Sequence, residues 1–162
     1  MYYVNYFFIF AFIGNFIERF FYDSWDSGIL YGPWTPIYGW GVVSILLINL
    51  FIDKKLKLTK IPKLIALFLI GAVFLSILEA IGGYSIEWIF GYSHWGYEHY
   101  RFNIGKYIAL EMAVVWGLAS VLVVTYIKPL FDKFVKKIPK LITCILIILY
   151  IIDNFCTFLF RY

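Results

Sequence analysis

Residues 84–111 read YSIEWIFGYSHWGYEHYRFNIGKYIALE, and this stretch separates two long apolar runs of the chain. It is the only long segment that is neither continuously apolar nor rich in lysine. It contains both histidines of the chain together with tyrosines, tryptophans and glutamates. Tryptophan and tyrosine concentrate where a membrane protein meets the water interface. We therefore expect the rest of the chain to be a membrane scaffold that holds this segment at one surface.

The composition is that of an integral membrane protein. Hydrophobic residues make up 63% of the chain and aromatic residues 23%, whereas soluble proteins are only about half apolar. Several apolar runs reach the roughly 20 residues that a helix needs to cross the hydrocarbon core. The net charge of +4 would also suit nucleic acid. Most of the chain's lysines, however, lie in two loops between apolar runs. Basic loops of this kind are expected at the cytoplasmic surface of a membrane protein, so we expect no nucleic-acid partner.

The pattern predicts an all-α fold: a polytopic transmembrane helix bundle of about five spans, with an irregular, aromatic-rich outer loop. We expect residues 1–162 to form a single membrane domain, and the first span to be a retained helix because it lacks a basic leader and a cleavage site. Pro36 suits the first turn of a helix, Gly39 permits close helix contact, and Gly82–Gly83 is expected to break the third helix. The predicted spans are about 2–21, 36–52, 61–82, 105–127 and 141–160.

Two lysine-rich loops predict the orientation. With five spans, residues 53–63 and 128–140 lie on the same side of the membrane, and they hold most of the chain's lysines. Cytoplasmic loops carry such an excess of basic residues. The N-terminus is therefore expected in the cytoplasm and residues 84–111 outside, in a multi-pass protein of the cell membrane.

Carboxylates gather at the predicted outer side. Glu18, Glu79 and Glu111 lie near the outer ends of three spans, and Glu87 and Glu98 lie in the outer segment. A carboxylate within a span is costly unless it faces a partner or a wet cavity, so each is a functional candidate. The alternative is that Glu79 and Glu111 only bond helices together, through tyrosine hydroxyls or through Arg101 and Lys106. We favour a ligand, ion or catalytic role.

Aromatic and histidine side chains flank these carboxylates. An interfacial belt explains most tryptophans of the chain, but Trp88 and Trp95 lie beside carboxylates, where aromatic faces suit an organic cation. His94, Glu98 and His99 form an H-x-x-x-E-H pattern, one residue longer than the inverted zinc-protease motif. On a helix the two histidines would point about 140° apart. We expect them to be polar anchors and expect no metal.

Three segments carry a resemblance to a known family: FIGNFIERFFY (12–22), GILYGPWTPIYGWG (28–41) and LEAIGGYSIEWIFGYSHWGYEHYRFNIGKYIALEMAVVWGL (78–118). Together they resemble the bacterial putative ABC-transporter permease type IV family, a membrane domain of unknown function, over roughly residues 10–130. The family pattern has a Glu that ends its first helix, a G-x-L-Y-G-P-x-x-P-I-Y-G-x-G turn, a Glu in its third helix and a W-D-Y-S…N-x-x-G-R segment. The matching positions here are Glu18, Gly28 to Gly41, Glu79, Trp95, Tyr97, Asn103 and Lys106.

Two positions depart from the family pattern. Gly96 stands where the family tends to have Asp, and Lys106 stands where it tends to have Arg. The first departure removes a carboxylate, so we expect its role to pass to a neighbour such as Glu98. The residues predicted to bind a ligand are Glu18, Glu79, Glu87, Trp88, Trp95, Glu98, His99, Asn103, Lys106 and Glu111.

These observations predict a small membrane transporter, or a component of one, that binds a polar or cationic solute in an outward-facing acidic and aromatic pocket. One alternative is a membrane enzyme that acts on lipid at the outer leaflet, with Glu79 or Glu111 as general base and His94 or His99 as its partner. Another is a non-catalytic accessory subunit. The chain has no phosphate loop or dinucleotide fingerprint, so we expect no cofactor, and any ATPase would be a separate chain. The expected partners are membrane lipids and either a second copy or another membrane or ATPase chain.

Overall fold

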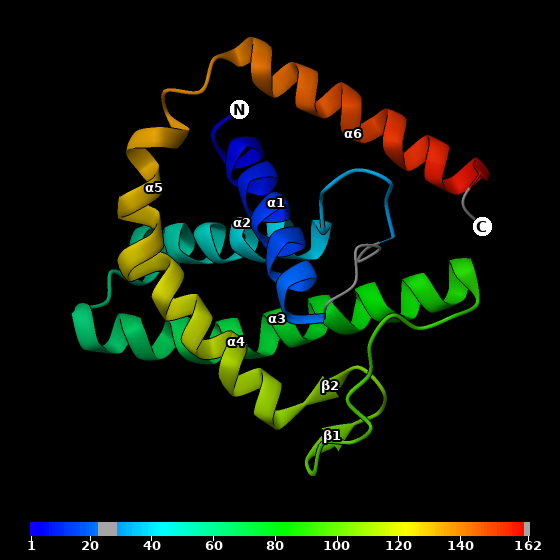
Figure 1. The fold of residues 1–162 in the computed structure, drawn as a ribbon. Helices are drawn as coiled ribbons and strands as arrows, with labels where there is room; N and C mark the ends of the chain where they lie inside the picture. The colour runs from blue at the N-terminus through cyan, green and yellow to red at the C-terminus, as the bar shows by residue number, and fades with distance from the viewer. Residues whose placement is uncertain (23–28, 161–162) are drawn as a thin grey trace. The chain divides into compact units, whose positions relative to one another are not determined.

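The computed structural model describes residues 1–22 and 29–160, which are almost entirely helical (Figure 1). Two short π-helical turns, Ile52–Leu56 and Val123–Ile127, continue α2 and α4 directly. The strands β1 and β2 pair antiparallel as a small hairpin. The elements are α1 (Tyr2–Tyr22), α2 (Pro36–Phe51), α3 (Lys60–Phe90), β1 (Asn103–Ile104), β2 (Ile108–Ala109), α4 (Leu110–Leu122), α5 (Lys128–Val135) and α6 (Lys140–Phe160).

Four helical segments within the described residues are long and apolar enough to cross a membrane: Pro36–Leu56, Lys60–Phe90, Leu110–Val135 and Lys140–Phe160. They carry large apolar side chains on exposed faces, as a lipid-facing surface requires. The chain is thus an all-α, multi-pass membrane protein. Helix α1 has 21 residues, but its tyrosines, asparagines and Glu18–Arg19 lower its hydropathy. The first of the five predicted spans therefore stays a prediction.

Helix α3 does not break at Gly82–Gly83, as the sequence had suggested, but continues to Phe90. Glycine at this point serves close packing, because a Cβ on Gly83 would lie 2.4 Å from the ring of Tyr107. The helix ends at Gly91, whose φ of +76° is left-handed and whose N–H bonds to the Glu87 carbonyl at 2.9 Å. The predicted start of the fourth span at residue 105 is also early. Helix α4 begins at Leu110, because the preceding residues form the β1–β2 hairpin.

The chain forms two compact units. The first comprises residues 1–43 and 130–162, and the second comprises residues 44–129. In the first unit, α1 and α2 meet at glycines, as predicted for Gly39. A Cβ there would lie 2.6 Å from the Phe7 carbonyl oxygen, and one on Gly14 would lie 2.4 Å from the Tyr38 ring. The buried Asn5 joins α1 to α5 and α6, because it donates to the Val135 carbonyl at 3.2 Å and accepts from Thr143 Oγ1 at 2.6 Å.

The second unit is built on the contact between α3 and α4, the most extensive helix contact in the described chain. Small residues let the two backbones approach. A Cβ on Gly71 would lie 2.5 Å from Ser120 Cβ, and one on Gly117 would lie 2.9 Å from the Phe68 carbonyl oxygen. Such small-residue contacts are a common means of helix association in membranes. The chain then returns from α3 through the β1–β2 hairpin to the start of α4 (Figure 1).

A Gly71→Ala substitution should lower the free energy of unfolding by about 1–3 kcal/mol, because overpacking in a closely packed interior costs that much. The new methyl group would meet Ser120 Cβ, an atom that cannot rotate away. Thermal unfolding in detergent micelles measures the effect. The double variant Gly71→Ala/Ser120→Gly should recover at least half of the loss, because it removes the clashing atom. An unchanged unfolding temperature for Gly71→Ala would contradict the described contact.

Candidate functional site

The segment between α3 and α4, residues 91–109, folds back on itself and is fastened by backbone bonds. The Tyr97 N–H donates to the Lys106 carbonyl at 2.7 Å, and the Leu110 N–H donates to the Phe102 carbonyl at 3.0 Å. Gly105 supplies the turn of the β1–β2 hairpin with a left-handed φ of +66°. The segment is therefore an ordered structure that brings its side chains onto α3 and α4.

Glu79, in α3, is the most buried of the predicted site residues, with 8% of its surface exposed. The Tyr97 hydroxyl donates to its Oε1 at 2.5 Å, and the Trp116 indole N–H donates to its Oε2 at 2.7 Å. We call these three residues the Glu79 centre. It joins α3, the 91–109 segment and α4. Both donors are neutral, and no Lys or Arg of the described chain pairs with Glu79. The hydrogen bonds orient the carboxylate without neutralising its charge.

Glu87, two turns further along α3, has a different environment. Lys106 Nζ lies 2.6 Å from its Oε1, and the Tyr107 hydroxyl donates to its Oε2 at 2.8 Å. The hydrogen bond to Glu87 raises the pKa of Lys106 above its ordinary value. Tyr107 is only 1% exposed and its hydroxyl lies 3.0 Å from Ser93 Oγ. This cluster ties the hairpin to the end of α3.

Trp95 and Glu111 each retain an unused polar atom. The Trp95 ring packs edge-on against Tyr107, with the ring centroids 5.7 Å apart. Glu111 Oε1 accepts the Phe102 N–H at 3.3 Å. The buried Nε1 of Trp95 and the buried Oε2 of Glu111 have no hydrogen-bond partner among the described residues. A buried polar group without a partner is costly, so these two atoms remain available to a water molecule or a ligand.

For the other predicted residues the structure shows contacts outside the Glu79 centre. Trp88 is 87% exposed, Asn103 bonds the Gly105 carbonyl within its own turn, and His99 packs on Tyr100 with ring centroids 4.5 Å apart. Glu18 belongs to the first compact unit, where it accepts from Thr35 Oγ1 at 3.1 Å. The structure thus gathers part of the predicted set around α3 and leaves the remainder exposed or in the other unit.

Glu98 lies beside Gly96. A Cβ on Gly96 would lie 3.5 Å from Glu98 Oε2. That a role at position 96 passes to Glu98 stays a prediction. The histidines show no comparable convergence. Among the described residues no group of three His, Cys, Asp or Glu side chains comes close enough to hold a metal ion.

A second buried carboxylate, which sequence reasoning did not select, is Asp153 of α6. It accepts the backbone N–H groups of Tyr31 and Gly32 at 3.1 Å and 2.9 Å, and also the Trp34 indole N–H. Thr157 Oγ1, one turn along α6, lies 3.4 Å away. Asp153 thereby anchors the G-P-x-x-P turn of residues 32–36. An aspartate within an apolar span was the available signal, because a charge there needs a partner.

Long apolar helices joined by loops that fold back onto buried carboxylates define a multi-pass α-helical membrane protein with internal polar centres. The sequence profile of the family described as "Putative ABC-transporter type IV" matches residues 5–158 of the chain. The chain belongs to this family, and so is a membrane protein related to ABC transporters. No curated protein and no solved structure matches the chain.

Proposed function

We propose that the protein is a membrane component of a transporter, and that it binds a cationic solute at the Glu79 centre. The observation that carries the proposal is the state of Glu79: a buried carboxylate held by two neutral donors, with no cationic side chain of the described chain beside it. A charge so placed within a membrane helix is by default a functional candidate. A bound cation would supply the missing compensation.

The surroundings of Glu79 favour an organic cation over a bare metal ion. Tyr97 and Trp116 place aromatic rings next to the carboxylate, and such rings attract an ammonium group through their π faces. Metal ions instead need several oxygen, nitrogen or sulfur ligands in a defined geometry. The excess of lysine in the loops 53–63 and 128–140 supports an outward-facing site in the cell membrane.

Membership of an ABC-transporter-related family supports association of this chain with other transporter components. The chain itself carries no phosphate loop, so ATP hydrolysis would require a separate ATPase chain, for which the lysine loops are the predicted docking side. The enzyme alternative has less support. Glu79 contacts Tyr97 and Trp116, and Glu111 contacts the Phe102 backbone. The His99 ring packs on Tyr100, and no hydrogen bond between His99 and either glutamate is seen among the described residues.

Binding of a simple quaternary ammonium ion tests the proposal. Tetramethylammonium should raise the unfolding temperature of the purified protein in a saturable way, because a ligand that binds only the folded state stabilises it by mass action. At a hundred times the Kd, that stabilisation is about 2.7 kcal/mol. Sodium chloride at equal ionic strength is the control. Equal effects of the two salts at every concentration would count against a cation site.

A further inference from the structure

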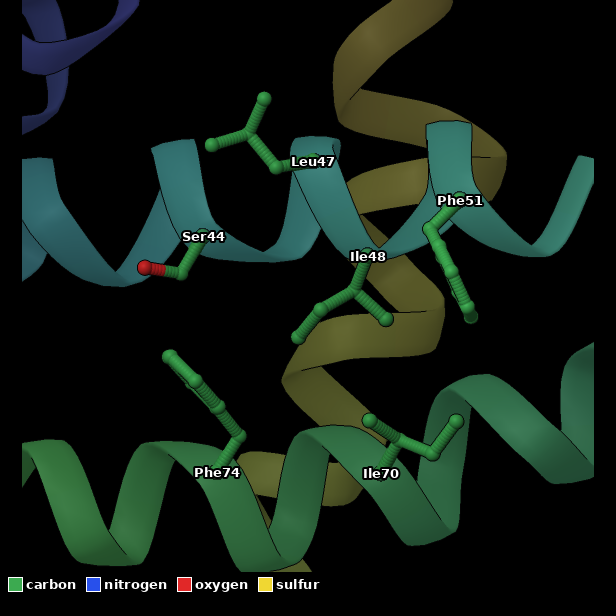
Figure 2. Close-up of a pocket in the computed structure, with 6 residues that line it drawn as sticks. All are labelled: Ser44, Leu47, Ile48, Phe51, Ile70 and Phe74. Carbon is green, nitrogen blue, oxygen red and sulfur yellow. The ribbon is translucent and has the colours of Figure 1, made fainter. Parts of the chain in front are cut away.

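An apolar groove lies between α2 and α3 within the second compact unit (Figure 2). Its volume is about 370 Å³. In Figure 2, Ile48 and Phe51 of α2 point toward α3, and Ile70 and Phe74 of α3 point toward α2. The full lining is Ser44, Leu47, Ile48, Phe51, Ile70 and Phe74, which includes none of the residues predicted to bind a polar solute. Both walls belong to helices that are long and apolar enough to cross a membrane.

One end of this groove is basic. Ser44, Ile48, Phe51 and Lys55 follow one another at helical spacings of three and four, so Lys55 continues the α2 wall into the π-helical turn. Lys63 lies two turns before Ile70 on the same side of α3, and so continues the other wall.

The two lysines differ in their partners. Lys63 is paired with Asp53 at 2.6 Å. Lys55 is exposed and has no carboxylate partner among the described residues. The loop adds three more lysines, Lys54, Lys57 and Lys60, against the single carboxylate of Asp53. The basic end of the groove therefore keeps an excess of positive charge at the membrane surface.

We propose that the α2–α3 groove binds one anionic glycerophospholipid, with an acyl chain between Ile48, Phe51, Ile70 and Phe74 and the headgroup phosphate on Lys55. The apolar walls match an acyl chain, and the uncompensated lysine at one end matches the phosphate. Basic positions between membrane helices are a recurring site for anionic headgroups. A neutral, zwitterionic lipid would gain the same apolar contact but less from the charge, so the site should discriminate between headgroups.

Lipid titration with native mass spectrometry tests this site. The full chain, freed of lipid in detergent micelles, is titrated with phosphatidylglycerol or with phosphatidylcholine of identical acyl chains. We expect tighter binding of phosphatidylglycerol, and an about fivefold loss of that affinity in Lys55→Gln, the usual contribution of one basic residue at a membrane surface. Lys137→Gln, in the other lysine loop, should leave it unchanged. Excess inorganic phosphate should not displace the lipid, because the acyl chain holds it.

A second variant tests the groove itself. Ser44→Trp should fill it and weaken both lipids, while thermal unfolding reports whether the variant is still folded. Equal affinity for the two lipids together with no effect of Lys55→Gln would overturn the proposal. A dimer that disappears in Ser44→Trp would also overturn it, because a second copy would then be the occupant of the groove.

Discussion

A Glu79→Gln variant should bind tetramethylammonium about tenfold more weakly than the wild-type protein, or worse. The substitution keeps the size of the side chain but removes its charge. Tetramethylammonium has no N–H to donate, so the loss is one of Coulomb attraction. Two unit charges about 4 Å apart attract by about 4 kcal/mol near a protein surface, and a tenfold loss of affinity needs only about 1.4 kcal/mol of this. The Tyr97 hydroxyl and the Trp116 indole N–H both donate to the Glu79 carboxylate. The NH2 group of a glutamine cannot accept a hydrogen bond, so one of these two bonds is lost as well. Tetramethylammonium titration, followed by the rise in unfolding temperature, measures the change.

Two controls separate binding from stability. Glu98→Gln removes an exposed carboxylate of the same segment and should leave cation binding unchanged. Tyr97→Phe removes one donor to Glu79 but leaves the charge, so it should lower the unfolding temperature and still bind the cation. If Glu79→Gln binds tetramethylammonium as well as the wild type does, the Glu79 centre is structural and the proposed function is wrong.

The second large effect is a loss of stability on substitution of Asp153. An Asp153→Ala substitution leaves the Tyr31 and Gly32 N–H groups and the Trp34 indole without their acceptor. The Trp34 indole is buried, and an unsatisfied buried group costs about 1–3 kcal/mol. The two backbone N–H groups are partly exposed and add less, so we expect a total of about 2–4 kcal/mol. The corresponding fall in unfolding temperature is roughly 5–15 °C. Tryptophan fluorescence during heating in detergent micelles records it.

The neighbouring residue provides the matched control. Asn154 is exposed, and its side chain donates to the Tyr150 carbonyl one turn earlier, so Asn154→Ala should change the free energy of unfolding by no more than about 0.5 kcal/mol. Asp153→Asn should be intermediate, because an amide keeps one acceptor oxygen. Equal unfolding temperatures for Asp153→Ala and Asn154→Ala would show that the turn does not depend on this carboxylate.

The fold class could be predicted from the sequence because it depends on local quantities. Apolar runs of sufficient length predict membrane helices, and four of the five predicted spans meet that criterion in the structure. The error at Gly82–Gly83 has a physical cause. Glycine lowers helix propensity by about 1 kcal/mol at an interior position. Here the ring of Tyr107, far along the sequence, packs into the space beside Gly83 and offsets that cost. Pattern reasoning along the chain does not include such a distant contact.

The candidate site could be predicted only as a set of residues. The glutamates were visible because charges are rare within spans. Their partners were not, since Glu79 meets Trp116 and Asp153 meets the Tyr31–Trp34 turn across long separations in sequence. Glu87 is bonded to Lys106 and Tyr107. For Glu79, the bond from the Tyr97 hydroxyl is of the kind that the structural alternative expects. No Lys or Arg of the described residues pairs with this carboxylate, and the ligand interpretation stays our proposal.

Native mass spectrometry of the protein extracted gently from its own membrane tests the central claim most directly. It reports the oligomeric state, companion chains and retained small molecules together. The account predicts a small cationic molecule on the wild-type protein that is missing from Glu79→Gln prepared in the same way. The contradictory result is a stoichiometric partner chain with no small molecule on either protein. The carboxylate would then serve only the fold, and the function would belong to the complex.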